Sequence, residues 1–194
     1  MTTANAILRS APRSRFTLAA FCLLAASSAA FAVLGCGSRQ NATGRTGLLA
    51  VGDSMPAFSA RDQENVVRVS AEFAGKPIVV YFYPRDATPG CTAEACAFRD
   101  AWERMQATGA IVLGVSTDGV DAHRSFANEH HLPFPLLADT SGEITGAFGV
   151  PIALGMAQRV TFIVGRNGKV ATVFPDVDPG VHVEEVLNAL EAIR

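Results

Sequence analysis

Two cysteines five residues apart, Cys91 and Cys96, are the residues of this sequence best suited to do chemistry. Cys91 follows an apolar run and a turn rich in proline and glycine, at a point where a helix should begin. The first N–H groups of a helix are unpaired and carry partial positive charge, which stabilises a thiolate. Cys91 is therefore predicted to act as a nucleophile.

The elements on either side of the cysteines must position them. Residues 77–83 and 110–116 are apolar runs typical of buried strands. A helix is expected between them, because apolar residues recur every three or four positions at Ala95, Phe98, Trp102 and Met105. Extended backwards, this stripe reaches Cys91, whose side chain should face inward.

The rest of the chain continues the alternation of strands and helices. We expect a helix at 121–131, a short strand at 133–137, a helical turn at 143–148, a hairpin of 160–164 with 170–174 around Asn167-Gly168, and a closing helix at 181–193. Strands separated by helices and finished by a hairpin imply a mixed sheet with helices on both faces. The predicted fold class is α/β, with a thioredoxin-like fold.

Composition limits the possible functions. The 194 residues, 49% of them hydrophobic and 18% charged, suffice for one globular domain and an extension. The net charge of -2 and the lack of a basic cluster in the body of the chain argue against nucleic-acid binding.

The N-terminal part of the sequence differs from the rest. Arginines at positions 9, 13 and 15 precede an uncharged run, residues 16–35, that ends at Cys36. We interpret residues 1–36 as an export signal or an uncleaved membrane anchor, residues 37–49 as a linker and residues 50–194 as the folded domain. The chain would then act outside the cytoplasm, in the periplasm or on that side of a bacterial membrane; a misassigned start codon on a cytoplasmic protein is the alternative.

Two kinds of processing fit the end of this N-terminal segment. Residues 33–36, Val-Leu-Gly-Cys, resemble the lipobox of bacterial lipoproteins, which makes Cys36 a candidate for lipidation, although a small residue is usual where Leu34 stands. Ala30-Phe31-Ala32 fits an ordinary cleavage site equally well. With Cys36 and Cys22 in this segment, the folded domain keeps only the pair Cys91 and Cys96.

The segment Pro84-x-x-x-Thr88-x-x-Cys91-x-x-Glu94 resembles the active-site motif of peroxiredoxins. Cys96 stands where the bacterioferritin comigratory protein (Q-type) subgroup of that family places its resolving cysteine. The similarity runs from Gly52 to the C-terminus, with further matches at 98–100, 134–139 and 159–162.

The resemblance implies a thiol-dependent peroxidase without a cofactor or metal. Cys91 would reduce a hydroperoxide and become a sulfenic acid, Cys96 would form a disulfide with it, and a thioredoxin-like donor would reduce that disulfide. Arg159 matches the family's catalytic arginine, Glu94 would orient it, Thr88 would contact the sulfur or the peroxide, and Pro84 would exclude water. Q-type members are often monomers, so a monomer is expected.

One segment departs from the Q-type pattern. The segment 149–158 is short and apolar, and it lacks the longer charged and aromatic insertion common in the subgroup. This departure leaves the preferred peroxide and the surface that docks the reductant open.

The spacing of the cysteines carries its own prediction. Residues five apart in an ideal helix have Cα atoms about 8 to 9 Å apart, whereas a disulfide needs less than about 7 Å. If Cys96 resolves Cys91, the first turns of the helix must unwind in every cycle.

Other functions remain open from the residues alone. A membrane-tethered thiol-disulfide oxidoreductase shares the fold, but it normally carries Cys-x-x-Cys, a shorter spacing than here. A noncatalytic redox sensor is the second alternative. His130-His131 invites a metal site, yet Cys-x4-Cys is poor zinc spacing, so we interpret the histidines as a solvated helix end.

Overall fold

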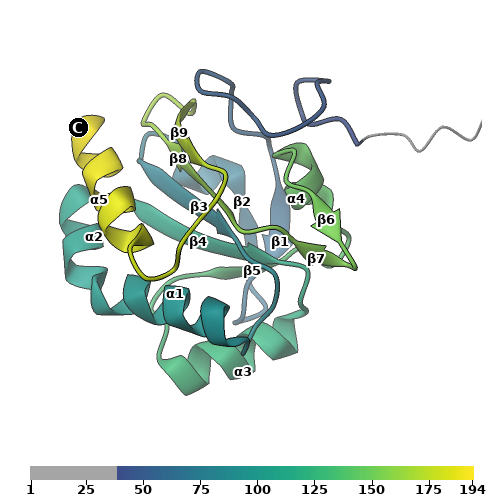
Figure 1. Cartoon of the computed structure of the whole chain (residues 1–194), viewed down its shortest axis with the longest axis vertical. Helices are drawn as coiled ribbons and strands as arrows, with labels where there is room; N and C mark the ends of the chain where they lie inside the picture. The colour runs from purple at the N-terminus through teal and green to yellow at the C-terminus, as the bar shows by residue number, and fades with distance from the viewer. Residues whose placement is uncertain (1–38) are drawn as a thin grey trace, which may run out of the picture. The chain divides into compact units, whose positions relative to one another are not determined.

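A mixed β-sheet runs through the part of the chain that the computed structural model describes, residues 39–194 (Figure 1). Its strands are β1 (Ser59–Arg61), β2 (Val67–Val69), β3 (Ile78–Phe82), β4 (Ile111–Ser116), β5 (Leu136–Ala138), β8 (Val160–Val164) and β9 (Val170–Phe174). In space they follow the order β2-β1-β5-β4-β3-β8-β9. The neighbours β3, β4 and β5 run parallel, and β8 is antiparallel to both β3 and β9. A separate small hairpin consists of β6 (Ile152–Ala153) and β7 (Met156–Ala157).

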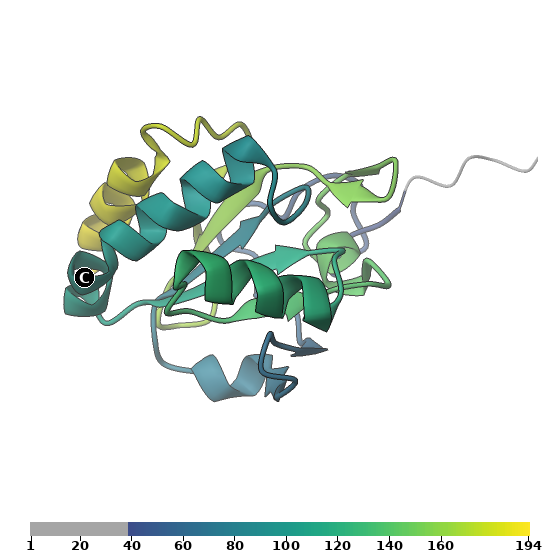
Figure 2. The same ribbon diagram turned by 90° about the horizontal axis from the view of Figure 1, so that it is seen from below.

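Helices cover both faces of this sheet, though unequally. They are a 3-10 helix η1 (Ser70–Phe73), α1 (Pro89–Asp100), α2 (Trp102–Thr108), α3 (Val120–His130), α4 (Glu143–Ala147) and α5 (His182–Ala192). Side chains of α1, α2, α3 and α5 share one apolar cluster with the sheet, while α4 and η1 contribute to the cluster on the opposite face. Figure 2 shows α1 and α3 side by side on the same face.

The position of β3 inside the sheet, with apolar clusters on both faces, explains why its sequence is apolar throughout. All five of its residues are buried, because successive side chains enter opposite clusters. On one face Tyr81 stacks on Phe98 of α1, with ring centroids 5.0 Å apart. On the other face Phe82 packs on Phe148, with centroids 5.2 Å apart. The strand that leads to the active cysteine is thus held from both sides.

The predicted elements are found with small shifts, and the thioredoxin-like mixed sheet is confirmed. The one helix expected after β3 is two, since the backbone leaves helical geometry at Ala101, where φ is -91° and ψ is 10°. The strand expected from 133 begins only after Pro135, because a proline has no N–H for the sheet. The hairpins β1–β2 and β6–β7 were not predicted.

Residues 39–49 correct the prediction of a linker over residues 37–49. Leu49 is buried in the core, and its N–H donates to the carbonyl of Phe148. The Asn41 side chain is also buried: its Nδ2 donates to the Gly47 carbonyl at 2.9 Å and its Oδ1 accepts from the Thr43 N–H at 2.9 Å. Glycine, asparagine and threonine suit turns as well as linkers, and here they form a turn packed on the domain.

The predicted export signal or anchor, residues 1–36, and the lipidation candidate Cys36 lie outside the described residues. Within residues 39–194, no helix is both long enough and apolar enough to cross a membrane.

Candidate active site

Cys91 is the third residue of α1 and lies at the end of the loop that follows β3. Its side chain faces inward and is buried, as the apolar stripe predicts. Thr88 is the N-cap residue and Pro89 opens the helix. Proline suits this position because its missing N–H would be unpaired there anyway. The thiol therefore lies within the first turn, where the helix offers unpaired N–H groups.

Arg159 contacts the Cys91 sulfur although 68 residues separate the two in sequence. Its Nη2 donates to Sγ at 3.2 Å. Arg159 directly precedes β8, and the antiparallel register pairs Val160 with Phe82, the last residue of β3. The start of β8 and the start of the active-site loop are therefore brought to the same edge of the sheet.

Glu94 binds the other arm of the same guanidinium. Arg159 Nη1 donates to Glu94 Oε2, and the Glu94 side chain is fully buried. Burial raises the pKa of Glu94 to about 7, although the charge and the hydrogen bond of Arg159 act in the opposite direction. Since Cys91 and Glu94 lie three apart on α1, one helix face presents both to the arginine.

Thr88 and Pro84 lie in the loop before α1, both half-buried. The Thr88 hydroxyl donates to the Arg85 carbonyl at 3.1 Å, and it makes no cap to the helix. Its proton is thus engaged in that hydrogen bond, whereas its lone pairs can still accept another one. The N–H groups of the first turn, without a side-chain cap, are available to a substrate.

Cys96 lies in the same helix as Cys91, and both thiols are free. Cys96 is half-buried, in contrast to the buried Cys91. Because α1 is continuous over both positions, their Cα atoms are separated by about 8 to 9 Å, the distance of an ideal helix. The two cysteines do not meet the geometry of a disulfide while α1 stays folded.

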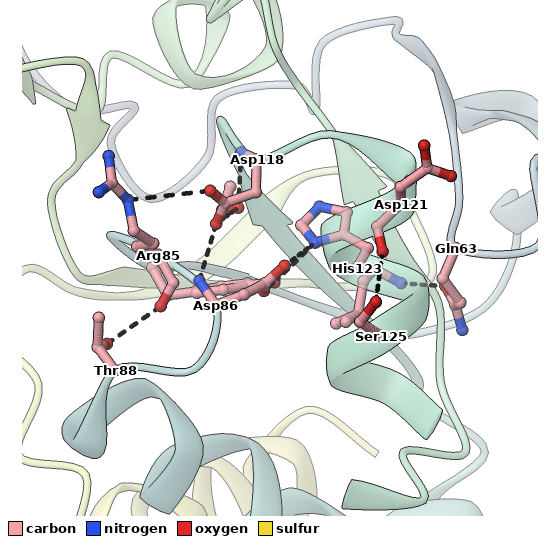
Figure 3. A network of polar contacts seen from close by, with 11 residues as sticks. Gln63, Arg85, Asp86, Thr88, Asp118, Asp121, His123 and Ser125 are labelled. Atoms are coloured by element: carbon pink, nitrogen blue, oxygen red, sulfur yellow. Dashed lines mark hydrogen bonds and ion pairs between the residues drawn. The ribbon is translucent and has the colours of Figure 1, made fainter. Parts of the chain in front are cut away.

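A buried polar network beside the site was missed by the sequence analysis. In Figure 3, Asp86 of the active-site loop points toward His123 of α3, and its Oδ2 lies 2.7 Å from His123 Nδ1. The other carboxylate oxygen accepts from the Tyr83 hydroxyl at 2.8 Å, and the Asp86 N–H donates to Asp118 Oδ2 at 2.8 Å. The signal that could have found it is His123 itself, which shares the buried face of α3 with Phe126 and Ala127.

The adjacent histidines behave as an ordinary helix end. His130 is the last residue of α3, and His131 is exposed and adopts a left-handed conformation with φ of 53°. Across residues 39–194, no three His, Cys, Asp or Glu side chains come together in a group that could hold a metal ion.

This arrangement suits attack by sulfur on a polarised bond. A thiolate at Cys91 would be stabilised by the Arg159 guanidinium and by the helix N-terminus. The same donors can stabilise negative charge on a leaving oxygen, since they are fixed before the reaction begins.

Comparisons with known proteins show the family to which the chain belongs. The family model described as AhpC/TSA family matches residues 51–173. The chain is 40% identical to Peroxiredoxin Q, chloroplastic, of Sedum lineare, over 74% of this chain and 78% of that protein.

Two solved structures have the same fold. Peroxidoxin BcpB from Mycobacterium tuberculosis is 34% identical, with a TM-score of 0.71 over 75% of this chain and 99% of that one. A Xanthomonas campestris bacterioferritin comigratory protein, described for its alkyl peroxide reduction activity, is 31% identical, with a TM-score of 0.66 over 70% of this chain and 90% of that one. The chain therefore belongs to the AhpC/TSA family and, within it, is similar to the peroxiredoxin Q and bacterioferritin comigratory proteins.

Proposed function

We propose that the chain is a thiol-dependent peroxidase in which Cys91 is the peroxide-reducing residue. The Cys91 thiolate attacks one oxygen of the O–O bond, and that bond breaks. The sulfur becomes a sulfenic acid, while the other oxygen leaves with the bonding electrons and takes up a proton as water or an alcohol. The observation that carries this proposal is the contact of Arg159 with the Cys91 sulfur.

Arg159 and Glu94 have separate roles in this scheme. The guanidinium stabilises the thiolate and then the charge on the departing oxygen. Glu94 holds the guanidinium from the opposite side through its buried carboxylate. The Thr88 hydroxyl donates to a carbonyl of its own loop, so its oxygen can accept a hydrogen bond from the hydroperoxide. Pro84 limits the access of water.

Cys96 completes the cycle. Its thiol attacks the Cys91 sulfenic acid, an S–S bond forms, and water leaves. A thioredoxin-like dithiol then reduces the disulfide and is itself oxidised to a disulfide. The position of both cysteines in α1 supports a step in which the first turns of that helix unwind.

Hydrogen peroxide and organic hydroperoxides are the proposed substrates. The activity named for the similar Xanthomonas campestris protein supports the organic class. The β6–β7 hairpin lies in the segment 149–158, which lacks the longer charged and aromatic insertion of the Q-type pattern, so the preference between the two kinds of peroxide has to be measured.

The compartment belongs to the proposal as well. The basic and apolar composition of residues 1–36 supports export, with Cys36 as the lipidation site or residues 16–35 as an anchor. The domain would act as a monomer outside the cytoplasm and receive electrons through a membrane carrier, since such compartments are oxidising. Labelling cells with a radioactive fatty acid tests the lipid: the chain should be labelled, and a Cys36→Ser chain should not.

Peroxide consumption by the purified chain tests the function. With excess dithiol or thioredoxin, we expect many equivalents of peroxide to be consumed per chain, and none with a Cys91→Ser variant. Consumption that stops at one equivalent in the presence of both reductants would favour a redox sensor instead.

A further inference from the structure

The loop that carries Pro84 and Thr88 to the active cysteine contains a residue in an unfavourable conformation. Ala87 has φ of 54°, in the left-handed region that residues other than glycine seldom adopt. A loop in this conformation persists only where neighbouring contacts hold it.

Asp86 makes those contacts, and it makes them with buried partners. His123 is fully buried, and its Nδ1 lies 2.7 Å from the Asp86 carboxylate, which assigns the ring proton to Nδ1 as donor. Burial also raises the pKa of Tyr83 well above its usual value, so the phenol keeps its proton and donates a hydrogen bond to Asp86. The second nitrogen of His123, Nε2, is buried and has no hydrogen-bond partner among the described residues, so Asp86 is the close polar partner of the ring.

The backbone of Asp86 is held from a second direction. Its N–H donates to Asp118 Oδ2 at 2.8 Å, and the Ser116 hydroxyl donates to the same oxygen at 3.0 Å. The loop is therefore attached both to the end of β4 and to α3 (Figure 3).

The far end of the same chain segment is also attached to α3. Arg99, in the last turn of α1, donates from Nη1 to the carbonyl of His130 at 2.8 Å. Phe98 beside it is fully buried. His123 and His130 are seven residues apart, about 10 Å along the axis of α3. One helix thus holds both ends of the segment 86–99, which contains both cysteines.

We propose that the two contacts of α3, with Asp86 and with Arg99, act as a brace that holds the segment 86–99 in place. His123 is then a positioning residue for the peroxide reaction, acting through Asp86. The inference rests on the proposed peroxidase function and adds a residue to it. With the brace intact, the loop and the first turn of α1 stay in the geometry that places Cys91 against Arg159. The unwinding that joins Cys91 to Cys96 is confined to the residues between the two attachments.

Loss of the His123 donor should slow the reaction with peroxide and accelerate the formation of the disulfide. The folded geometry favours attack on peroxide, whereas disulfide formation needs the unwound one. A His123→Leu variant is therefore expected to react with hydrogen peroxide about tenfold more slowly and to form the disulfide several-fold faster. A residue that only stabilised the fold would not produce this opposition.

Two further variants keep the test independent of folding. His123→Asn places an amide donor where Nδ1 lies and should restore both rates to within about twofold. Asp86→Asn keeps the size of the side chain but removes the charge that accepts both donors, and it should behave like His123→Leu. Asp121→Asn makes the same chemical change at an exposed position of α3 and should leave both rates unchanged.

The rates can be followed by stopped-flow fluorescence, because the single tryptophan, Trp102, begins the helix after α1. Hydrogen exchange of the reduced chain supplies a readout that does not depend on turnover. It should accelerate at residues 84–92 in His123→Leu and stay slow at 102–108.

The outcomes separate the two proposals. If the original chain consumes no peroxide, the proposed function fails, while unchanged exchange in His123→Leu would overturn the brace. Suppose that the original chain reacts with peroxide, and that His123→Leu and His123→Asn either slow both the peroxide reaction and disulfide formation equally or change neither rate. The positioning role of His123 is then overturned, while the peroxidase function stands.

Discussion

The guanidinium of Arg159 joins Cys91 and Glu94 from one side of the site, with its Nη2 3.2 Å from the Cys91 sulfur. The sulfur is buried, so this contact is made where water screens it little. Loss of this contact should therefore slow the reaction of Cys91 with peroxide.

Replacement of Arg159 by lysine keeps the positive charge but loses the planar fork that reaches both partners. We expect the second-order rate constant with hydrogen peroxide to fall about a hundredfold, the loss typical of a preorganised donor. Stopped-flow fluorescence of Trp102 measures it. Arg166→Lys, at an exposed arginine, is the matched control and should be unchanged. A loss below threefold in Arg159→Lys would contradict the assignment.

Replacement of Cys96 by serine should separate the two halves of the cycle. The variant keeps Cys91 and Arg159, so one equivalent of peroxide should be reduced at the original rate. Turnover driven by thioredoxin should be lost, because no intramolecular disulfide can form. The measurement is NADPH oxidation with thioredoxin and its reductase, and a variant that turns over at the original rate would rule out Cys96 as the resolving residue.

The helix that holds both cysteines should change its dynamics with oxidation. In the reduced chain, the N–H groups of α1 beyond its first turn are hydrogen-bonded within the helix and should exchange slowly. In the disulfide form, residues 88–98 should exchange at least tenfold faster, since the cysteines cannot pair within a regular helix. Hydrogen exchange with mass spectrometry compares the two forms, with α5 as the internal reference. Equally slow exchange in both forms would show that the helix does not unwind.

The buried carboxyl of Glu94 should make stability depend on pH. Its pKa in the folded chain is about 7, above the ordinary 4.5, so protonation stabilises the folded state. That contribution is complete below pH 4.5 and is lost as the pH rises through about 7. Relative to Glu94→Gln, the original chain should lose about 3 kcal/mol of unfolding free energy over this range.

Urea unfolding of the two chains at a series of pH values measures the difference, and all other titrating groups cancel between them. Parallel curves from pH 4.5 to 8 would mean that the carboxyl of Glu94 titrates at its ordinary value.

His182 should make stability depend on pH in the direction opposite to that of Glu94. Burial lowers its pKa below 6.5, although Glu185 acts against the shift, and its Nε2 lies 2.8 Å from the Thr161 hydroxyl. The neutral ring is favoured in the folded state, so this contribution is present above pH 6.5 and is lost as the pH falls through the lowered pKa. His182→Gln keeps an amide near Thr161 and should unfold with a weaker loss of stability in acid. A loss of stability in acid as steep as that of the original chain would contradict it.

The sequence by itself determined the local part of this protein. A turn of proline and glycine before Cys91 begins the helix, and the spacing of Ala95, Phe98 and Met105 directs its inner face. The runs at 78–82 and 160–164 are strands because every residue is apolar or β-branched. These features depend on neighbours within a few positions, which periodicity and turn chemistry describe well.

Only the tertiary structure decided which distant residues meet. Arg159 reaches Cys91 because β8 pairs with β3 in one register, and a shift by one residue would turn its neighbours to the other face. His123 meets Asp86 because α3 packs beside α1 on the same face of the sheet. Residues 39–49 have the composition of a linker, yet the burial of Leu49 holds them to the core. Such contacts depend on how whole elements pack, and spacing along the chain carries no record of that.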